Sequence, residues 1–148
     1  MKYTIILILI CLGCAGEDGK SIPFSEYEGL LSGKWYWLSE TYTDIQGSKK
    51  EFSPETVGYS KSLTFEQNIY MYQKNDSLIC KDKYVLIEER KAIDGEYRPH
   101  IRLEKWIQLG NTIGFDHDLE IKFETHTKLI LTHRVYDNTS VYMYQKTD

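Results

Sequence analysis

From residue 34 to residue 146 the chain repeatedly alternates apolar and polar side chains. β-Branched and aromatic residues carry this alternation, and short segments rich in Asn, Asp and Gly interrupt it. Such a pattern is typical of antiparallel strands that bury one face and expose the other. We predict strands over residues 34–43, 61–66, 69–74, 78–88, 99–108, 119–124, 128–135 and 141–146.

The number of these segments indicates a closed sheet. About eight strands are enough to close a barrel, and closure removes the exposed edges at which sheets aggregate. Helical character is confined to residues 25–32, where Ser25 could cap a short helix and Leu30 and Leu31 form its apolar edge. Neighbouring parallel strands would need crossover connections, for which the sequence shows no helices. The expected fold class is all-β: an antiparallel up-and-down β-barrel of about eight strands with a short N-terminal helix.

The alternation also predicts which side chains face the interior, once Trp35 is placed inward. A shift of one residue would move a strand's whole set to the opposite face. The predicted interior consists of Trp35, Trp37, Leu63, Phe65, Tyr70, Tyr72, Tyr84, Leu86, Ile101, Leu103, Ile121, Phe123, Leu129, Leu131, Tyr142 and Tyr144. The chain has 12 tyrosines, and a buried phenol supplies apolar area plus one hydroxyl that needs a partner. These rings either line a ligand cavity or fill the barrel.

One segment of the chain occurs twice. Residues 69–76 (IYMYQKND) recur as residues 141–148 (VYMYQKTD), and Lys34-Trp35 recurs as Lys105-Trp106. Either half of the barrel was duplicated, or two strands with the same inward and outward faces converged on one pattern. Convergence is favoured because the middle strands have no matching partner at this spacing. Both explanations place successive tyrosines on one face.

The N-terminal residues indicate export. Lys2 precedes an apolar run over residues 5–12, and a polar segment follows at residues 17–20. The run is about half of the ~20 residues that a membrane-spanning helix needs, as is typical of a signal peptide. We predict a signal peptide over residues 1–13, a flexible linker over residues 14–24 and one barrel domain over residues 25–148. Removal of the signal peptide and modification of Cys14 would leave Cys80 as a small buried side chain.

Two segments resemble known proteins. Leu12-Gly13-Cys14 resembles the lipobox of bacterial lipoproteins, which implies that Cys14 carries acyl chains such as palmitate and anchors the protein to a membrane. Residues 30–38 (LLSGKWYWL) resemble the opening strand of lipocalin-like domains, and residues 63–65, 84–86, 128–131 and 140–144 follow in the same order as in lipocalin-like lipoproteins of Gram-negative bacteria. This resemblance implies a calycin-type barrel with one end plugged by the Gly33-Lys34-Trp35 region and the other end open to a cavity.

These observations lead to an expected function. We predict a lipoprotein of the cell envelope, at the periplasmic face of the outer membrane or on the cell surface, whose barrel binds a small, largely apolar ligand. The predicted cavity lining is Trp37, Phe65, Tyr70, Tyr72, Tyr84, Tyr142 and Tyr144, and the predicted structural plug is Gly33, Trp35 and Trp106. In the alternative, the barrel is filled and serves as a structural module or binds another envelope protein, with charged residues 88–98 among its contacting loops.

Other function classes find less support in the sequence. A net charge of −4 disfavours nucleic acid, which requires clustered Lys and Arg. The chain lacks the nucleophile-elbow, zinc-protease and phosphate-loop motifs, so we expect no enzyme activity. Asp116-His117-Asp118 is interpreted as a solvated turn because its carboxylates and imidazole would point to opposite faces of a strand. No metal and no cofactor are expected.

Overall fold

The computed structural model describes residues 22–91, 95–104, 107–108, 111–112, 117–135 and 138–147. Predictions for residues 1–13, for Cys14 and for Trp106 lie outside the described residues. The described helices are η1 (Phe24–Glu26), α1 (Tyr27–Leu31) and α2 (Pro54–Val57). The described strands are β1 (Gly33–Thr43), β2 (Lys49–Phe52), β3 (Lys61–Glu66), β4 (Ile69–Lys74), β5 (Ser77–Lys91), β6 (Tyr97–Leu103), β7 (Ile107–Gln108), β8 (Asn111–Thr112), β9 (His117–Thr125), β10 (Lys128–Val135) and β11 (Asn138–Lys146).

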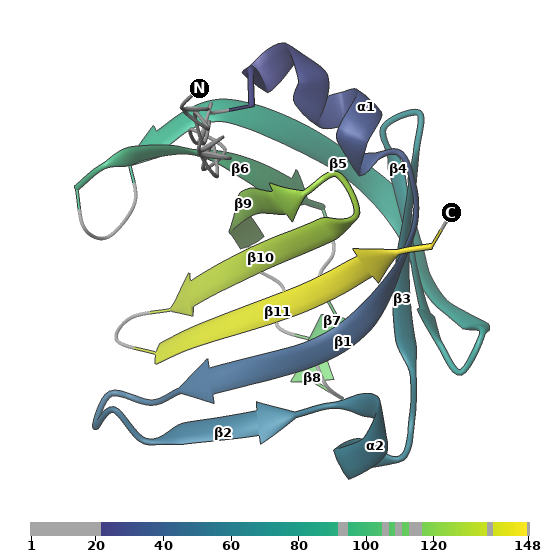
Figure 1. The fold of residues 1–148 in the computed structure, drawn as a ribbon, viewed down its shortest axis with the longest axis vertical. Coiled ribbons are helices and arrows are strands. Elements are labelled where there is room, and N and C mark those ends of the chain that lie inside the picture. Colours follow the sequence, from purple (N-terminus) through teal and green to yellow (C-terminus); the bar gives the residue numbers. More distant parts are fainter. Residues whose placement is uncertain are drawn as a thin grey trace, which may run out of the picture.

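Eight antiparallel strands close into a barrel, which confirms the predicted fold class. The order around the barrel is β1, β3, β4, β5, β6, β9, β10 and β11, and pairing of β11 with β1 closes it. β1 pairs with β3 through its first residues and with β2 through its last ones, so that β2 extends the wall where β3 ends (Figure 1). Hydrogen bonds between first and last strand leave the barrel without a free edge there.

Two short turns fix the register of β3, β4 and β5. Gln67 and Asn68 connect β3 to β4, and Asn75 and Asp76 connect β4 to β5. All four residues have positive φ, between 47° and 63°. This left-handed conformation matches the twist of a two-residue hairpin, and Asn and Asp tolerate it better than most residues do.

Burial confirms the predicted inward face of the barrel. Of the 16 side chains predicted to face inward, 14 are buried, while Tyr72 and Leu86 are half-buried and pack against the same core. The two copies of the repeated segment also place their tyrosines on the same face, because Tyr70, Tyr142 and Tyr144 are all buried. Cys80 is buried as a free thiol, as expected for a small apolar side chain.

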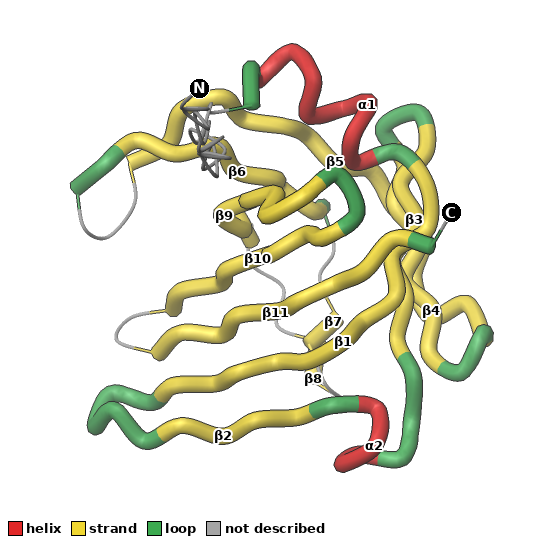
Figure 2. The backbone as a smooth tube through the Cα atoms, in the orientation of Figure 1, coloured by secondary structure: helices red, strands yellow, loops and turns green. Residues whose placement is uncertain are grey.

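At one end of the barrel, α1 packs over the interior (Figure 2). Leu31 and Trp35 are both 0% exposed, and the Trp35 indole N–H donates a 2.7 Å hydrogen bond to the Leu31 carbonyl. Lys146 Nζ lies 5.4 Å from the centre of the Trp35 ring and donates to the Ser32 carbonyl. Gly33 has φ of 110°, and a Cβ there would lie 2.9 Å from the Lys146 side chain, so a larger residue would displace that lysine. We call this arrangement the closed end.

Three local predictions were wrong. Residues 44–60, for which no element was predicted, contain β2 and α2, whose capping box joins Ser53 and Thr56. The predicted strand over residues 99–108 ends at Leu103, because residues 107–108 pair with residues 111–112 in a separate local hairpin. Ser25 lies inside η1 and caps no helix; the 3₁₀ turn begins one residue earlier, after Pro23.

Candidate functional site

A bulge in β1 carries the first polar side chain into the barrel. Trp37 pairs with Tyr144 and Ser39 with Met143, so Leu38 is an extra residue between them. The bulge shifts the alternation by one position, and Glu40 therefore points inward with 2% of its surface exposed. Without the bulge, Glu40 would lie on the outer face, where carboxylates are usually solvated.

Lys61 on β3 neutralises this buried carboxylate. The distance from Lys61 Nζ to Glu40 Oε2 is 3.2 Å, and the two side chains are 5% and 3% exposed. Burial lowers the pKa of Lys61, and the charge of Lys74 lowers it further, whereas Glu40 acts in the opposite direction. Taking two charges out of water is expensive unless they are paired, so neither partner is stable here without the other.

Aromatic rings surround the Lys61 ammonium. Its Nζ lies 4.1 Å from the centre of the Trp37 ring and 5.8 Å from that of Tyr59. The Trp37 and Tyr59 rings are nearly parallel, with centroids 6.3 Å apart. Lys74 Nζ lies 4.0 Å from the Tyr59 centroid. Each contact places a positive charge near the negative face of a ring, which stabilises the charge by about 0.5–2 kcal/mol.

The chain positions Tyr59 through a sharp turn and a hairpin contact. α2 ends at Val57, and the C-cap residue Gly58 has φ of 74°, a conformation that favours glycine. The next residues are held to the turn between β4 and β5, because the Ser60 N–H donates to Asn75 Oδ1 at 2.9 Å and the Asn75 N–H donates to the Ser60 carbonyl at 3.0 Å. Tyr59 is thereby fixed beside the last inward residue of β4.

We define the polar cluster as Trp37, Glu40, Tyr59, Lys61, Tyr72, Lys74, Tyr142 and Tyr144. It lies toward the end of the barrel away from α1, since β1 begins at the closed end and reaches Glu40 after the bulge. His133 and Ser140 are also buried and are register partners on β10 and β11, one inward position beyond Tyr142. The interior is thus divided into an apolar closed end and a polar half.

The indole N–H of Trp37 is buried and has no hydrogen-bond partner among the described residues. Trp37 is 3% exposed, so water has little access to this donor. A buried donor left unsatisfied costs about 1–3 kcal/mol, and such groups are rare enough in native proteins to call for an explanation. By contrast, the Trp35 N–H at the closed end is satisfied by the Leu31 carbonyl.

Tyr72 and Tyr144 of the polar cluster have raised pKa values. Burial, together with Tyr59 and Glu40, raises the pKa of Tyr72 to about 12 from 10.0. Burial also raises the pKa of Tyr144, with Tyr142, Tyr72 and Glu40 acting in the same direction. These phenols are therefore neutral at physiological pH and can both donate and accept hydrogen bonds.

The raised pKa of Tyr72 predicts that the protein loses stability at alkaline pH. Below pH 10.0 the phenol is neutral in both states, but between 10.0 and about 12 the unfolded chain ionises while the folded chain does not. Tyr72→Phe should therefore lose stability less steeply over this interval, as measured by urea unfolding at a series of pH values. Tyr36→Phe, on the outer face of β1, is the matched control for loss of a hydroxyl. Equal slopes for Tyr72→Phe and the parent would contradict the prediction.

The structure divides the predicted cavity lining into two groups. Trp37, Tyr72, Tyr142 and Tyr144 belong to the polar cluster. The others lie toward the closed end: Phe65 contacts Tyr84 edge to face with centroids 5.3 Å apart, and the Tyr70 hydroxyl lies 3.4 Å from Cys80 Sγ. Both groups belong to one buried core, and the first group is the one that lies around Glu40 and Lys61.

Sequence reasoning missed several residues of this site for different reasons. Lys61 could have been found, because the alternation that places Leu63 and Phe65 inward continues to it. Glu40 could not, because an unbroken alternation from Trp37 would have turned Ser39 inward. Tyr59 lies outside every strand, so no periodicity marks it.

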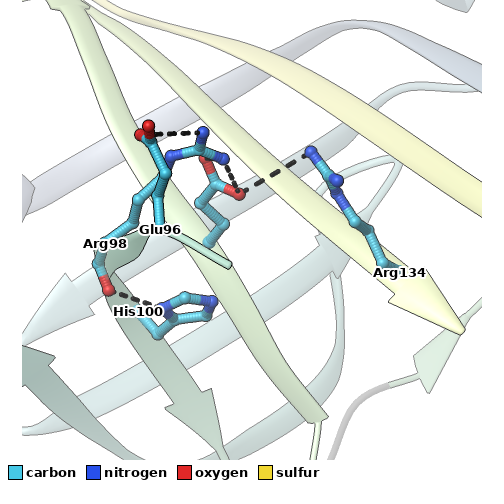
Figure 3. A network of polar contacts seen from close by, with 5 residues as sticks. Glu96, Arg98, His100 and Arg134 are labelled. Carbon is cyan, nitrogen blue, oxygen red and sulfur yellow. Dashed lines mark hydrogen bonds and ion pairs between the residues drawn. The ribbon is translucent and has the colours of Figure 1, made fainter. Parts of the chain in front are cut away.

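A second polar network joins side chains of β6, β9 and β10 (Figure 3). Arg98 Nη1 donates to both carboxylate oxygens of Glu120 at 3.2 and 3.3 Å, and Arg134 lies 3.9 Å from the same carboxylate. Glu120 alternates with the inward Leu119 and Ile121, which places this network outside. Partly exposed ion pairs of this kind contribute roughly 0–1 kcal/mol each to stability. We therefore interpret this network as structural, since it links β6, β9 and β10.

The expected solvated turn at residues 116–118 needs correction. Asp116 lies outside the described residues, but Asp118 belongs to β9, and its side chain is only 5% exposed. Arg102 binds it through two hydrogen bonds of 2.7 and 3.0 Å. The described residues contain no group of three or more His, Cys, Asp or Glu side chains that could hold a metal ion.

Comparisons of the chain with profiles of protein families, with curated proteins and with solved structures found no match. The closed antiparallel barrel of eight strands agrees with the calycin-type fold that the sequence resemblance implies. Among the helices of residues 22–147 that the structure describes, none is long and apolar enough to cross a membrane.

Proposed function

We propose that this protein is an exported lipoprotein, anchored through Cys14, whose barrel binds a small, largely apolar molecule. The observation that carries the binding proposal is the buried Trp37 indole N–H, which has no acceptor among the described residues. Packing alone does not require such a donor, since apolar side chains can fill a barrel interior without the cost of an unsatisfied N–H. A bound molecule with one acceptor would satisfy it.

The chemistry of the polar cluster supports a ligand with both an apolar body and a polar group. Trp37, Tyr72 and Tyr144 supply aromatic rings to the interior, and the ion pair of Glu40 and Lys61 supplies its charges. Binding sites of this type combine mostly apolar walls with a few polar groups that orient the ligand. The proposed activity is recognition of such a molecule, without chemical change.

Native mass spectrometry of the full chain purified from the membranes of producing cells tests this proposal. We expect a retained small molecule, and diacylglycerol on Cys14. Tyr72→Ala should reduce retention of that molecule because it removes a ring of the polar cluster, whereas Tyr36→Ala on the outer face of β1 should not. Absence of any retained molecule, or equal retention by both variants, would favour a filled barrel that acts as a structural or protein-binding module.

A further inference from the structure

Two lysines face each other at the polar end of the barrel. Lys61 and Lys74 are direct register partners on β3 and β4, and directly opposite residues of neighbouring antiparallel strands lie on the same face. Like charges in this position repel, and the charge of Lys74 accordingly disfavours protonation of Lys61. Water solvates the exposed Lys74 ammonium, whereas the buried Lys61 ammonium depends on its neighbours for compensation.

Glu40 compensates only one of the two positive charges. It is the one carboxylate of the polar cluster, and its Oε2 lies 3.2 Å from Lys61 Nζ. Lys74 is exposed and contacts the face of the Tyr59 ring at 4.0 Å. The polar cluster therefore contains two ammonium groups and one carboxylate, an excess of one positive charge.

The unsatisfied donor lies beside this positive charge. Lys61 Nζ is 4.1 Å from the centre of the Trp37 ring whose N–H has no acceptor among the described residues. An anionic oxygen that accepted a hydrogen bond from this indole would lie in the ring plane, while the Lys61 ammonium lies over the face of the same ring. Charge-assisted hydrogen bonds of this kind are about twice as strong as neutral ones.

We propose that the polar cluster binds a small organic carboxylate, with its anionic group held by the Trp37 N–H and balanced by Lys61 and Lys74. This inference rests on the proposed function, because it names the ligand class of the same site. A neutral ligand would satisfy Trp37 but leave the excess charge. A cation would meet two ammonium groups. The aromatic rings next to the charges favour a carboxylate that carries an apolar chain or ring over a small inorganic anion.

Isothermal titration of the full-length chain with octanoate and with octanol tests the ligand class. The two probes share the same chain length and differ in the charged group. We expect octanoate to bind at least tenfold more tightly than octanol, roughly the effect of one hydrogen bond to a charged group, and added salt to reduce this preference. Equal affinity for both probes would overturn the inference and leave the proposed function standing, whereas binding of neither would count against both.

Two variants test which residues cause the preference for octanoate over octanol. Lys74→Met removes an exposed charge and should reduce octanoate affinity several-fold without changing octanol affinity. Trp37→Phe removes the N–H but keeps a ring, and it should reduce octanoate affinity roughly tenfold. Lys81→Met removes an exposed charge from the opposite face of neighbouring β5 and is the matched control. If Lys81→Met weakens octanoate binding as much as Lys74→Met, the preference reflects net charge alone and the proposed site is wrong.

Discussion

Trp35→Ala should destabilise the protein by about 3–5 kcal/mol, the usual cost of removing a fully buried aromatic side chain. Trp35 is 0% exposed, contacts Phe123 with ring centroids 5.9 Å apart and donates a hydrogen bond to the Leu31 carbonyl. Alanine would leave a cavity beneath α1 and an acceptor without its donor. Because single domains are stable by only about 5–15 kcal/mol, this change should remove a large part of the protein's stability.

The neighbouring residue provides the control for this prediction. Tyr36 lies on the opposite face of the same strand and is 39% exposed. Tyr36→Ala should cost about 1 kcal/mol or less, a typical value for a side chain on a solvated strand face. Urea unfolding of the parent and both variants measures the difference. Similar losses from Trp35→Ala and Tyr36→Ala would show that the closed end does not depend on the Trp35 ring.

The barrel was predictable because one physical rule governs most of it. Alternating burial assigned inward faces correctly from Trp35 to Tyr144, and β3, β4 and β10 have the predicted bounds. In a closed antiparallel sheet with one solvated face, each strand must bury alternate side chains, so the alternation in the sequence predicts the fold directly. Asn and Asp pairs marked the turns that require positive φ, at residues 67–68 and 75–76.

The site was less predictable because it depends on departures from that rule. The bulge at Leu38 has no separate sequence signal, yet it alone turns Glu40 inward. Tyr59 reaches the interior from a loop between α2 and β3, where period-two reasoning does not apply. Irregular backbone in an otherwise regular barrel is common next to binding sites, because it directs side chains to places that alternation would not allow.

The Glu40–Lys61 pair should respond very differently to single and double replacement. Lys61→Met leaves the Glu40 carboxylate buried without a counter-charge, and Glu40→Leu leaves the Lys61 ammonium in the same state. Breaking a buried ion pair from one side typically costs about 3–5 kcal/mol. Both single variants should therefore unfold at clearly lower urea concentration than the parent.

Combining both replacements removes the two charges together and should recover most of the lost stability. Replacement of a buried ion pair by apolar residues of similar volume often leaves stability unchanged or raises it by about 1–4 kcal/mol. A double-mutant cycle from urea unfolding gives the coupling energy of Glu40 and Lys61 directly.

The same double variant should still close the barrel, since the register of β1 with β3 rests on backbone hydrogen bonds and on Trp35 and Leu63. The double variant keeps the net charge of the polar cluster on the exposed Lys74, so its octanoate affinity should fall only because the Lys61 ammonium next to Trp37 is lost. A stable double variant that does not bind would show that the ion pair serves recognition; additive losses would show instead that Glu40 and Lys61 act independently in holding the barrel together.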